Sequence, residues 1–133
     1  MTVQRDDAAG VLEADGAAFH GVVSAVLYAD RRLRLTYRPQ PGAALIRLIG
    51  EIDATNRAAL EETLVRARHG GDRLLVDVRH LRFVDVGGLR TLAELCRTGT
   101  ARLVNVPPRL HRLAGRLGLS LRAGAPDGAS EHD

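Results

Sequence analysis

Residues 74–96 read LLVDVRHLRFVDVGGLRTLAELC, and they carry the clearest structural signal in the chain. The first part of this stretch, residues 74–78, is almost continuously apolar, as expected of a strand inside a sheet. After the two glycines, the apolar side chains recur at the spacing of one helix face: Leu89, Leu92, Ala93 and Cys96. A buried strand followed by an amphipathic helix indicates an α/β architecture.

The same alternation continues on both sides of this stretch. Residues 44–49 form an apolar run that predicts a strand covered on both faces. Helical spacing follows Asp53 as far as residues 69–71, and strand 103–106 is followed by a helix over 110–117. Residues 21–29 and 33–37 predict antiparallel edge strands, and residues 120–122 a last strand. We therefore predict one α/β domain with a mixed, mainly parallel sheet of four to six strands and about three helices.

Length and composition fit this single domain. The chain has 133 residues, of which 45% are hydrophobic, 26% charged and 3% aromatic, so the core must consist of aliphatic side chains. Residues 1–20 have weak periodicity and predict a flexible acidic leader. The domain is expected over residues 21–122. The Gly-, Ala- and Pro-containing residues 123–133 predict a disordered acidic tail.

Charge is divided unevenly along the chain. All 19 basic residues are arginine. The leader has one arginine against four carboxylates, and the tail three carboxylates and no arginine, so each has a net charge of −3. The 18 arginines and nine carboxylates of residues 21–122 give this part +9. Such a body favours an acidic partner. Because its arginines are scattered and aromatic residues are few, we expect no nucleic-acid partner.

The cellular compartment follows from what the chain lacks. Cys96 is the only cysteine, which excludes a disulfide within one chain. No apolar run has the length of a membrane span, and the N-terminus does not resemble a signal peptide. We therefore expect a cytoplasmic protein without a membrane partner.

The carboxyl ends of three predicted strands, where α/β proteins usually bind ligands, carry polar residues. They are Asp53, the turn at residues 83–85 and Asn105. Asp53 and Asp85 could act as an acid and a base, or hold a divalent ion. Each also precedes a predicted helix, where a carboxylate caps free N–H groups. Capping is the interpretation we favour, and an enzymatic or small-ligand-binding domain that uses both aspartates is the alternative.

Other residue patterns point to no enzyme. The histidines lack the spacing of metal ligands, and Cys96 lies on the apolar face of its helix, as a buried cysteine does. The glycine pairs 70–71 and 87–88 do not belong to a phosphate-binding loop, since no lysine is present. We therefore expect no catalytic residue, no metal and no cofactor.

The two glycines in FVDVGGL, residues 83–89, open a helix directly after Asp85. Without side chains, they would leave backbone N–H groups accessible to an anion or to another chain. This helix start is the most informative surface that the sequence predicts.

Several motifs resemble the STAS family, the sulphate-transporter and anti-sigma-factor-antagonist domain. LIGEID at residues 48–53 is similar to the family's L-x-G-E-L-D, and LVDV at 75–78 to its LVLDL. FVDVGGL is similar to its F-I-D-S-S-G-L. Residues 103–107 and the helix at 110–118 also fit, so the resemblance spans about residues 33–122. It is greatest to free-standing bacterial, especially actinobacterial, anti-sigma factor antagonists.

The resemblance implies a non-enzymatic protein of transcriptional control. Such antagonists bind a serine kinase anti-sigma factor, and phosphorylation of the first serine of D-S-S-G-L ends that binding. Here Val86 and Gly87 replace the two serines, so the phosphoacceptor is absent. The resemblance then implies either constitutive binding of that partner or binding of another STAS-associated regulator, with a homodimer as a further option. Thr55 and Thr91 are the candidate substitute acceptors.

The binding face implied by the family comprises the Asp53 turn and the start and outer side of the helix. Val86 has a second interpretation, in which it packs against the core as a hydrophobic contact at the start of its helix. The sequence leaves both open. The candidate partner-binding residues are Asp53, Asp85, Val86, Gly87, Gly88, Leu89, Arg90, Thr91 and Glu94.

Overall fold

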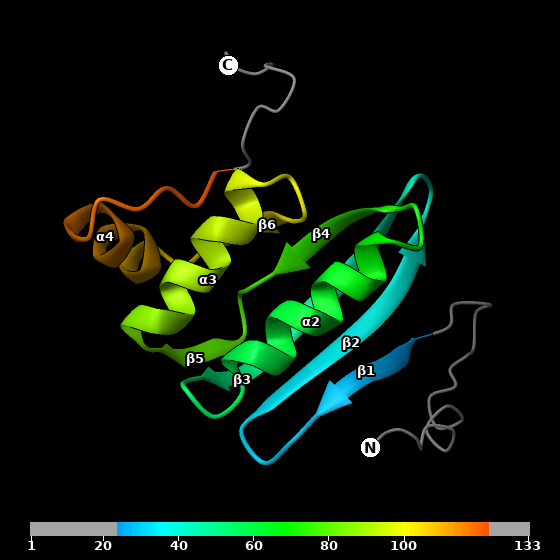
Figure 1. The fold of residues 1–133 in the computed structure, drawn as a ribbon, viewed down its shortest axis with the longest axis horizontal. Coiled ribbons are helices and arrows are strands. Elements are labelled where there is room, and N and C mark those ends of the chain that lie inside the picture. The colour runs from blue at the N-terminus through cyan, green and yellow to red at the C-terminus, as the bar shows by residue number, and fades with distance from the viewer. Residues whose placement is uncertain (1–23, 123–133) are drawn as a thin grey trace.

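The computed structural model describes residues 24–122, so the predicted leader and tail lie outside the described residues, as does the start of the expected 21–29 strand. Six strands and three helices follow one another in this part of the chain (Figure 1). In chain order they are β1 (Ala25–Ala29), β2 (Leu33–Gln40), β3 (Ala43–Ile52), α2 (Arg57–Arg68), β4 (Arg73–Asp77), β5 (Leu81–Val84), α3 (Val86–Arg97), β6 (Arg102–Val104) and α4 (Pro108–Arg116).

The six strands form one sheet in the order β1-β2-β3-β4-β6, and β5 also pairs with β3. β1, β2 and β3 are antiparallel, whereas the β3–β4, β3–β5 and β4–β6 pairs are parallel. β3 is ten residues long. Two short strands therefore share its one edge: β4 pairs with Ala43–Arg47 and β5 with Gly50–Ile52. The predicted mixed, mainly parallel sheet with antiparallel edge strands is confirmed.

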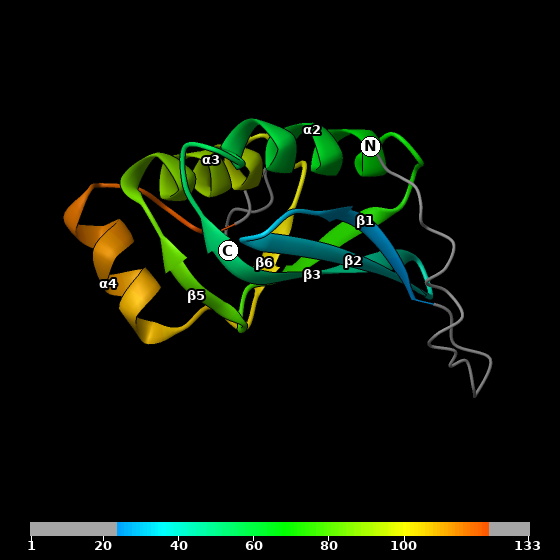
Figure 2. The same ribbon diagram turned by 90° about the horizontal axis from the view of Figure 1, so that it is seen from below.

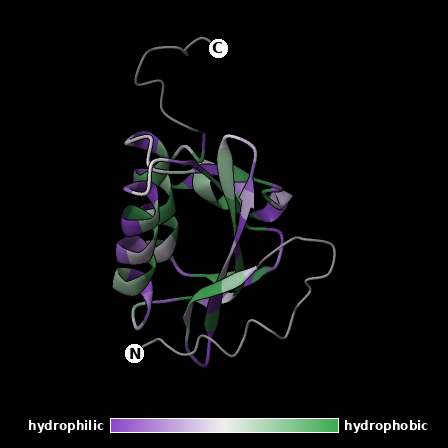
Figure 3. Cartoon of the chain, turned by 90° about the vertical axis from the view of Figure 1, so that its right-hand side faces the viewer, coloured by the Kyte–Doolittle hydropathy of each residue, from purple (hydrophilic) through white to green (hydrophobic). Residues whose placement is uncertain are grey.

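The helices lie on both sides of the sheet, but unequally. α2 and α3 cover one face side by side, and α4 lies on the opposite side near β5 (Figures 2 and 3). Most of the second face therefore has no helix over it among residues 24–122.

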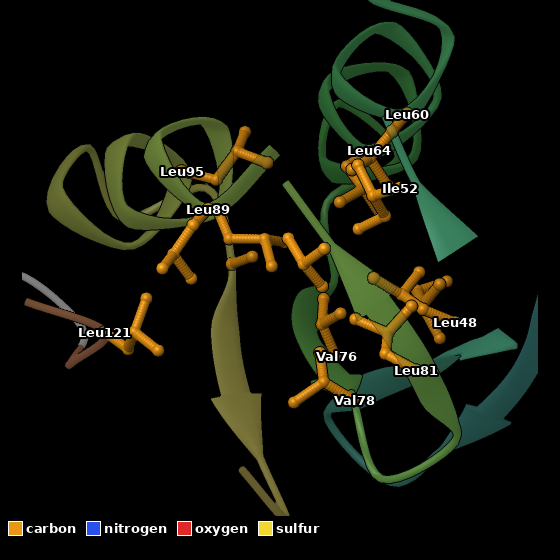
Figure 4. Packing of buried hydrophobic residues seen from close by; sticks show 14 of the residues in the cluster. Leu48, Ile52, Leu60, Leu64, Val76, Val78, Leu81, Leu89, Leu95 and Leu121 are labelled. Carbon is orange, nitrogen blue, oxygen red and sulfur yellow. The ribbon is translucent and has the colours of Figure 1, made fainter. Parts of the chain in front are cut away.

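The core lies between the sheet and the pair α2 and α3, and it consists of aliphatic side chains as predicted (Figure 4). α2 contributes Leu60 and Leu64, and α3 contributes Leu89, Leu92 and Leu95, to a cluster whose members are almost fully buried. Burying a side chain of this size stabilises the fold by about 1.5–3 kcal/mol. Cys96 is buried with them, as its helical spacing predicted.

The prediction that the strand over residues 44–49 is covered on both faces is wrong. Burial alternates along β3: Ala44, Ile46 and Leu48 are fully buried, whereas Arg47 and Ile49 are exposed. Apolar residues at positions 45 and 49 made the run look continuous. The reason is that helices pack on only one face of this part of the sheet.

Two other expectations about strands are also corrected. The residues expected as a turn at 83–85 include the end of β5, a four-residue strand in which the two central residues, Arg82 and Phe83, are both exposed. Residues 120–122 form no strand. Leu121 is nevertheless buried, and its carbonyl oxygen lies 3.5 Å from the Cys96 sulfur.

Gly50 allows the end of β3 to approach the β1–β2 turn closely. Its φ is +121°, and a Cβ atom there would lie 2.0 Å from the carbonyl oxygen of Arg32. The next amide, of Glu51, donates a 2.8 Å hydrogen bond to that oxygen. Only glycine fits this position without strain, and the contact holds Arg32 beside the end of β3.

Candidate functional site: the start of α3

β3 and β5 end side by side, and this register brings the two aspartates together. Ile52 pairs with Val84, so Asp53 and Asp85 follow directly from paired residues. The Asp85 amide donates to the Ile52 carbonyl oxygen at 3.1 Å. Asp53 and Asp85 therefore lie together at the carboxyl ends of β3 and β5.

Asn105 does not join them. β6 ends at Val104, which is level with Asp77 of β4 and therefore with Arg47 of β3. Arg47 precedes Ile52 by five positions, a distance of about 16 Å along a strand. Of the three strand-end positions considered from the sequence, two form the site.

Asp85 caps α3 as predicted. Its backbone is extended, and its Oδ1 atom accepts a 2.7 Å hydrogen bond from the Gly88 amide. A cap of this kind stabilises a helix by about 1 kcal/mol, and its charge complements the helix dipole. Val86 is therefore the first residue of α3.

Val86 lies on the surface, where 44% of the residue is exposed. A hydrophobic staple uses the residue before the cap and the fourth helical residue. Here those positions hold Val84 and Leu89, which are both buried in the core. The hydrophobic staple considered for Val86 is therefore formed at the positions of Val84 and Leu89.

Arg57, the first residue of α2, lies over Gly87. A Cβ atom on Gly87 would be 1.7 Å from Arg57 Nη1 and 2.6 Å from Cζ. The same Nη1 atom is 3.8 Å from Asp85 Oδ1. The sequence predicted that the glycines would let another group approach the start of α3, and here that group is the Arg57 guanidinium of the same chain. A side chain at position 87 would fit only if Arg57 moved.

Gly88 and Leu89 are buried and are not part of the exposed surface. A Cβ on Gly88 would lie 2.6 Å from Ile52 Cγ2, so this glycine allows α3 to pack directly on the sheet. Of the candidate partner-binding residues, these two act beneath the surface and hold α3 in place.

The exposed side of α3 presents Val86, Arg90 and Glu94 at intervals of four residues, which places them in one row. Thr91 is half-buried beside the row, and its hydroxyl donates to the Gly87 carbonyl oxygen at 3.1 Å. Hydrogen bonds from Arg97 lower the pKa of Glu94. We call Asp53, Asp85 and this row, with Thr91, the α3 face.

Asp53 does not cap α2, which corrects that expectation. The cap position is Asn56, which makes no side-chain hydrogen bond to the helix. Asp53 instead closes a turn: its Oδ1 atom accepts from the amide and the hydroxyl of Thr55, and Arg32 Nη1 lies 3.2 Å from Oδ2. The Thr55 hydrogen bonds, with the charge of Arg32, hold the pKa of Asp53 below its ordinary value.

Asn56 is fully buried and joins β3 to α2. Its amide nitrogen donates to the Glu51 carbonyl oxygen, and its oxygen accepts from the Asp53 amide, both at 3.0 Å. A buried asparagine satisfied in this way fixes the turn that presents Asp53 and Thr55.

Sequence reasoning missed three residues around this site. Arg57 and Asn56 gave no signal, because their roles depend on where α2 starts. Phe83 is 51% exposed on β5, three residues before Val86. A phenylalanine in a short strand predicts burial, so only the one-sided covering of the sheet explains its exposure.

Among residues 24–122, no three or more His, Cys, Asp or Glu side chains gather as a metal site requires. The helices in the same range are too short or too polar to span a bilayer.

Residues 35–121 match the family described as "Mlab, STAS domain", which covers more than half of the chain. The chain belongs to the STAS domain family. The resemblance found in the motifs of β3, β4 and the α3 start is thereby confirmed.

Comparison with other proteins adds a likeness of fold. A crystal structure of an anti-sigma factor antagonist from Mycobacterium paratuberculosis matches with a TM-score of 0.55 and 23% identity, over 68% of this chain and 81% of that one. The murine anion transporter Slc26a9 matches with a TM-score of 0.48 and 21% identity, over 58% of this chain and 14% of that chain. No curated protein sequence matches the chain.

Proposed function

We propose that this STAS domain is a cytoplasmic, bacterial anti-sigma factor antagonist that binds a protein partner through the α3 face without phosphorylation control. The partner class is a serine kinase anti-sigma factor or a related regulator, and no catalytic step or cofactor is involved. The observation that carries the proposal is the half-exposed Val86 at the first position of α3. A valine there is available for contact and cannot accept a phosphoryl group.

The neighbouring residues support this interpretation. In the serine form of the motif, a phosphate would add about −1.5 to −2 charges at the helix start and would disrupt a packed interface. Here position 86 has no hydroxyl, and Arg57 fills the space at position 87. Val86 therefore keeps the start of the α3 row apolar, and Arg90 and Glu94 follow it along the helix.

The Thr55 and Thr91 hydroxyls are poor substitutes for the missing acceptor. Each already donates a hydrogen bond, Thr55 to Asp53 and Thr91 to the Gly87 carbonyl oxygen. Phosphorylation would have to break these bonds. The alternative of acid–base chemistry is likewise not favoured, because Asp53 and Asp85 are both engaged in hydrogen bonds and ion pairs.

The Val86→Asp variant tests the proposal. We expect the wild-type protein, used as bait in a lysate of its host, to retain a serine kinase anti-sigma factor that mass spectrometry identifies. Val86→Asp should lose this partner while its melting temperature stays unchanged. The matched control is Leu27→Asp, which places the same charge at an apolar residue of similar exposure on β1.

Two results would overturn the proposal. One is equal retention of the kinase by Val86→Asp and wild type. The other is a label on Thr55 or Thr91 after incubation with the purified partner and ATP, which would show control by phosphorylation.

A further inference from the structure

The sheet has a second surface with features of a binding site, on the side away from α2 and α3. Register and burial define it: Arg34, Thr36 and Arg38 of β2 pair with Ile49, Arg47 and Leu45 of β3. The alternate residues of both strands, Leu35, Ile46 and Leu48, are buried beneath α2 and α3. We call the outward positions of the strands the open sheet face. They are Val26, Ala29, Arg34, Thr36, Arg38, Gln40, Ala43, Leu45, Arg47, Ile49, Glu51, Arg73, Leu75, Asp77, Phe83, Arg102 and Val104.

The open sheet face is partly apolar. It holds three of the five large hydrophobic residues that are exposed among residues 24–122: Val26, Ile49 and Phe83. They come from β1, β3 and β5, so the apolar positions run across the sheet. In the register of the sheet, polar positions such as Thr36, Arg34 and Glu51 lie between them, so the face offers single apolar contacts among charged side chains.

The open sheet face is also positively charged. It has five arginines against two carboxylates, Glu51 and Asp77. Arg47 is 3.8 Å from Asp77, and Glu51 is paired with Arg32 and Arg82 from outside the face. Within residues 24–122, no ion pair involves the other four arginines, which are Arg34, Arg38, Arg73 and Arg102.

This combination selects among possible occupants. A second copy docked face to face would bring arginines against arginines, which is repulsive. Single-stranded nucleic acid would need stacking platforms, and Phe83 is the one aromatic side chain of the face. An acidic polypeptide that also carries apolar side chains complements both properties.

We propose that the open sheet face binds the chain's own acidic N-terminal segment, residues 5–20. This segment has Asp6, Asp7, Glu13 and Asp15 against a single arginine, and its apolar residues include Val11, Leu12 and Phe19. Its charge and its hydrophobic residues therefore match those of the face. The inference does not depend on the proposed partner of the α3 face.

Connectivity favours this segment over the equally acidic C-terminal one. The N-terminal segment leads into β1, which is itself the edge strand of the sheet. Residues 123–133 instead follow Leu121, which packs beside Cys96 of α3 on the other side of the sheet. The sixteen residues 5–20 reach about 50 Å when extended, and five strands span about 20 Å, so the segment is long enough to cross the face.

Because the N-terminal segment is covalently joined to β1, even a weak interaction with the open sheet face would keep it bound there. A segment joined directly to β1 is present at its own sheet at an effective concentration on the order of millimolar. Attraction between exposed charges is screened over about 8 Å at physiological ionic strength, so the interaction should weaken as salt is added.

Paramagnetic relaxation in the full-length protein tests this proposal. The variant Ala9→Cys carries a nitroxide label on its new cysteine, since Cys96 is buried and does not compete. We expect the amide signals of Arg34 and Ile49 to lose most of their intensity at low salt. The signal of Glu61, which is exposed on α2, should keep its intensity, and 0.5 M NaCl should restore the other two.

Two sets of variants serve as controls. Neutralising the segment should abolish the effect without altering any residue of the sheet; the changes are Asp6→Asn, Asp7→Asn, Glu13→Gln and Asp15→Asn. Arg34→Glu with Arg38→Glu should also abolish it. The matched pair Arg112→Glu and Arg116→Glu, with the same charge change on exposed residues of α4, should not.

Two outcomes overturn the proposal. In one, the nitroxide reduces the amide signal of Glu61 as strongly as that of Ile49, or reduces neither signal. In the other, mixing nitroxide-labelled protein with unlabelled isotope-enriched protein produces the full effect, so that the segment binds a second copy instead.

Discussion

At the scale of single residues, the site depends on polar side chains that hold backbone groups. Asp85 holds the start of α3 through the Gly88 amide, and Asn56 holds the end of β3 through two backbone groups. Asp53 sits between them, bonded to Thr55. None of the three acts on a substrate in our proposal. They fix the positions of Val86 and of the turn beside it.

Acidification should show the role of the Asp53–Thr55 pair. An aspartate whose folded-state pKa is lowered stabilises the fold above its unfolded pKa, about 3.9, and this contribution is lost as pH falls through the lowered value. In Thr55→Val the hydroxyl is gone, so the Asp53 pKa should rise towards its ordinary value, whereas Thr55→Ser should retain the low one. Titration of the Asp53 carboxyl carbon by NMR measures this. Equal pKa values in the two variants would contradict it.

At the scale of elements, the decisive contact is between the first turns of α2 and α3. Arg57 packs over Gly87 and pairs with Asp85, so the two helices are joined at the end where the α3 face begins. Gly50 has a comparable role on the other side, where it brings the β1–β2 turn against the end of β3. Glycines thus determine how closely three elements meet around the site.

Replacing Gly87 by alanine has two opposing effects on stability, a gain in helix propensity and the displacement of Arg57. Alanine in a helix is favoured over glycine by about 0.5–1 kcal/mol. In the wild-type background this gain should be offset, because the new Cβ displaces Arg57 and breaks its ion pair. We therefore expect Gly87→Ala to be nearly neutral, but to stabilise the Arg57→Ala variant by the full amount. Urea unfolding of the four proteins gives the coupling, and additive values would show that the contact is unimportant.

The sequence predicted the elements better than their surroundings. Strong periodicity located the strand at residues 74–78, the helix from Val86 and the Asp85 cap, because these depend on nearby residues. The sequence did not reveal β5, whose four residues include two exposed side chains. It also predicted burial on both faces of β3, whereas only one face is covered. The Arg57–Gly87 contact joins residues 30 positions apart, so only the packing of α2 against α3 could reveal it.

At the scale of the whole molecule, the two faces of the sheet differ in how they are covered. One is sealed by α2 and α3 into an aliphatic core, whereas the other leaves arginines and three large apolar side chains accessible. A domain built in this way can present the α3 face and the open sheet face at once. The two proposals therefore use different surfaces of one domain, the exposed side of α3 and the uncovered face of the sheet.

The reactivity of the buried Cys96 thiol reports whether the core beneath α2 and α3 opens. Burial raises the pKa of this thiol to about 11, and the sulfur is covered by the segment around Leu121. Since only the thiolate reacts with disulfide reagents, we expect the native protein at pH 8 to react slowly and the protein in 6 M guanidinium to react fully.

Alkalinity should then destabilise the fold through the same group. A thiol with a raised pKa contributes its full stabilisation below its ordinary value, near 9, and loses it as pH rises towards 11. Cys96→Ala removes this dependence, so its melting temperature should fall less between pH 8 and 10.5 than that of wild type. Equal decreases in the two proteins, or rapid reaction of the native thiol, would mean that the α3 side of the core opens readily. In that case the helix that carries Val86 would not be held rigidly enough to present a fixed binding face.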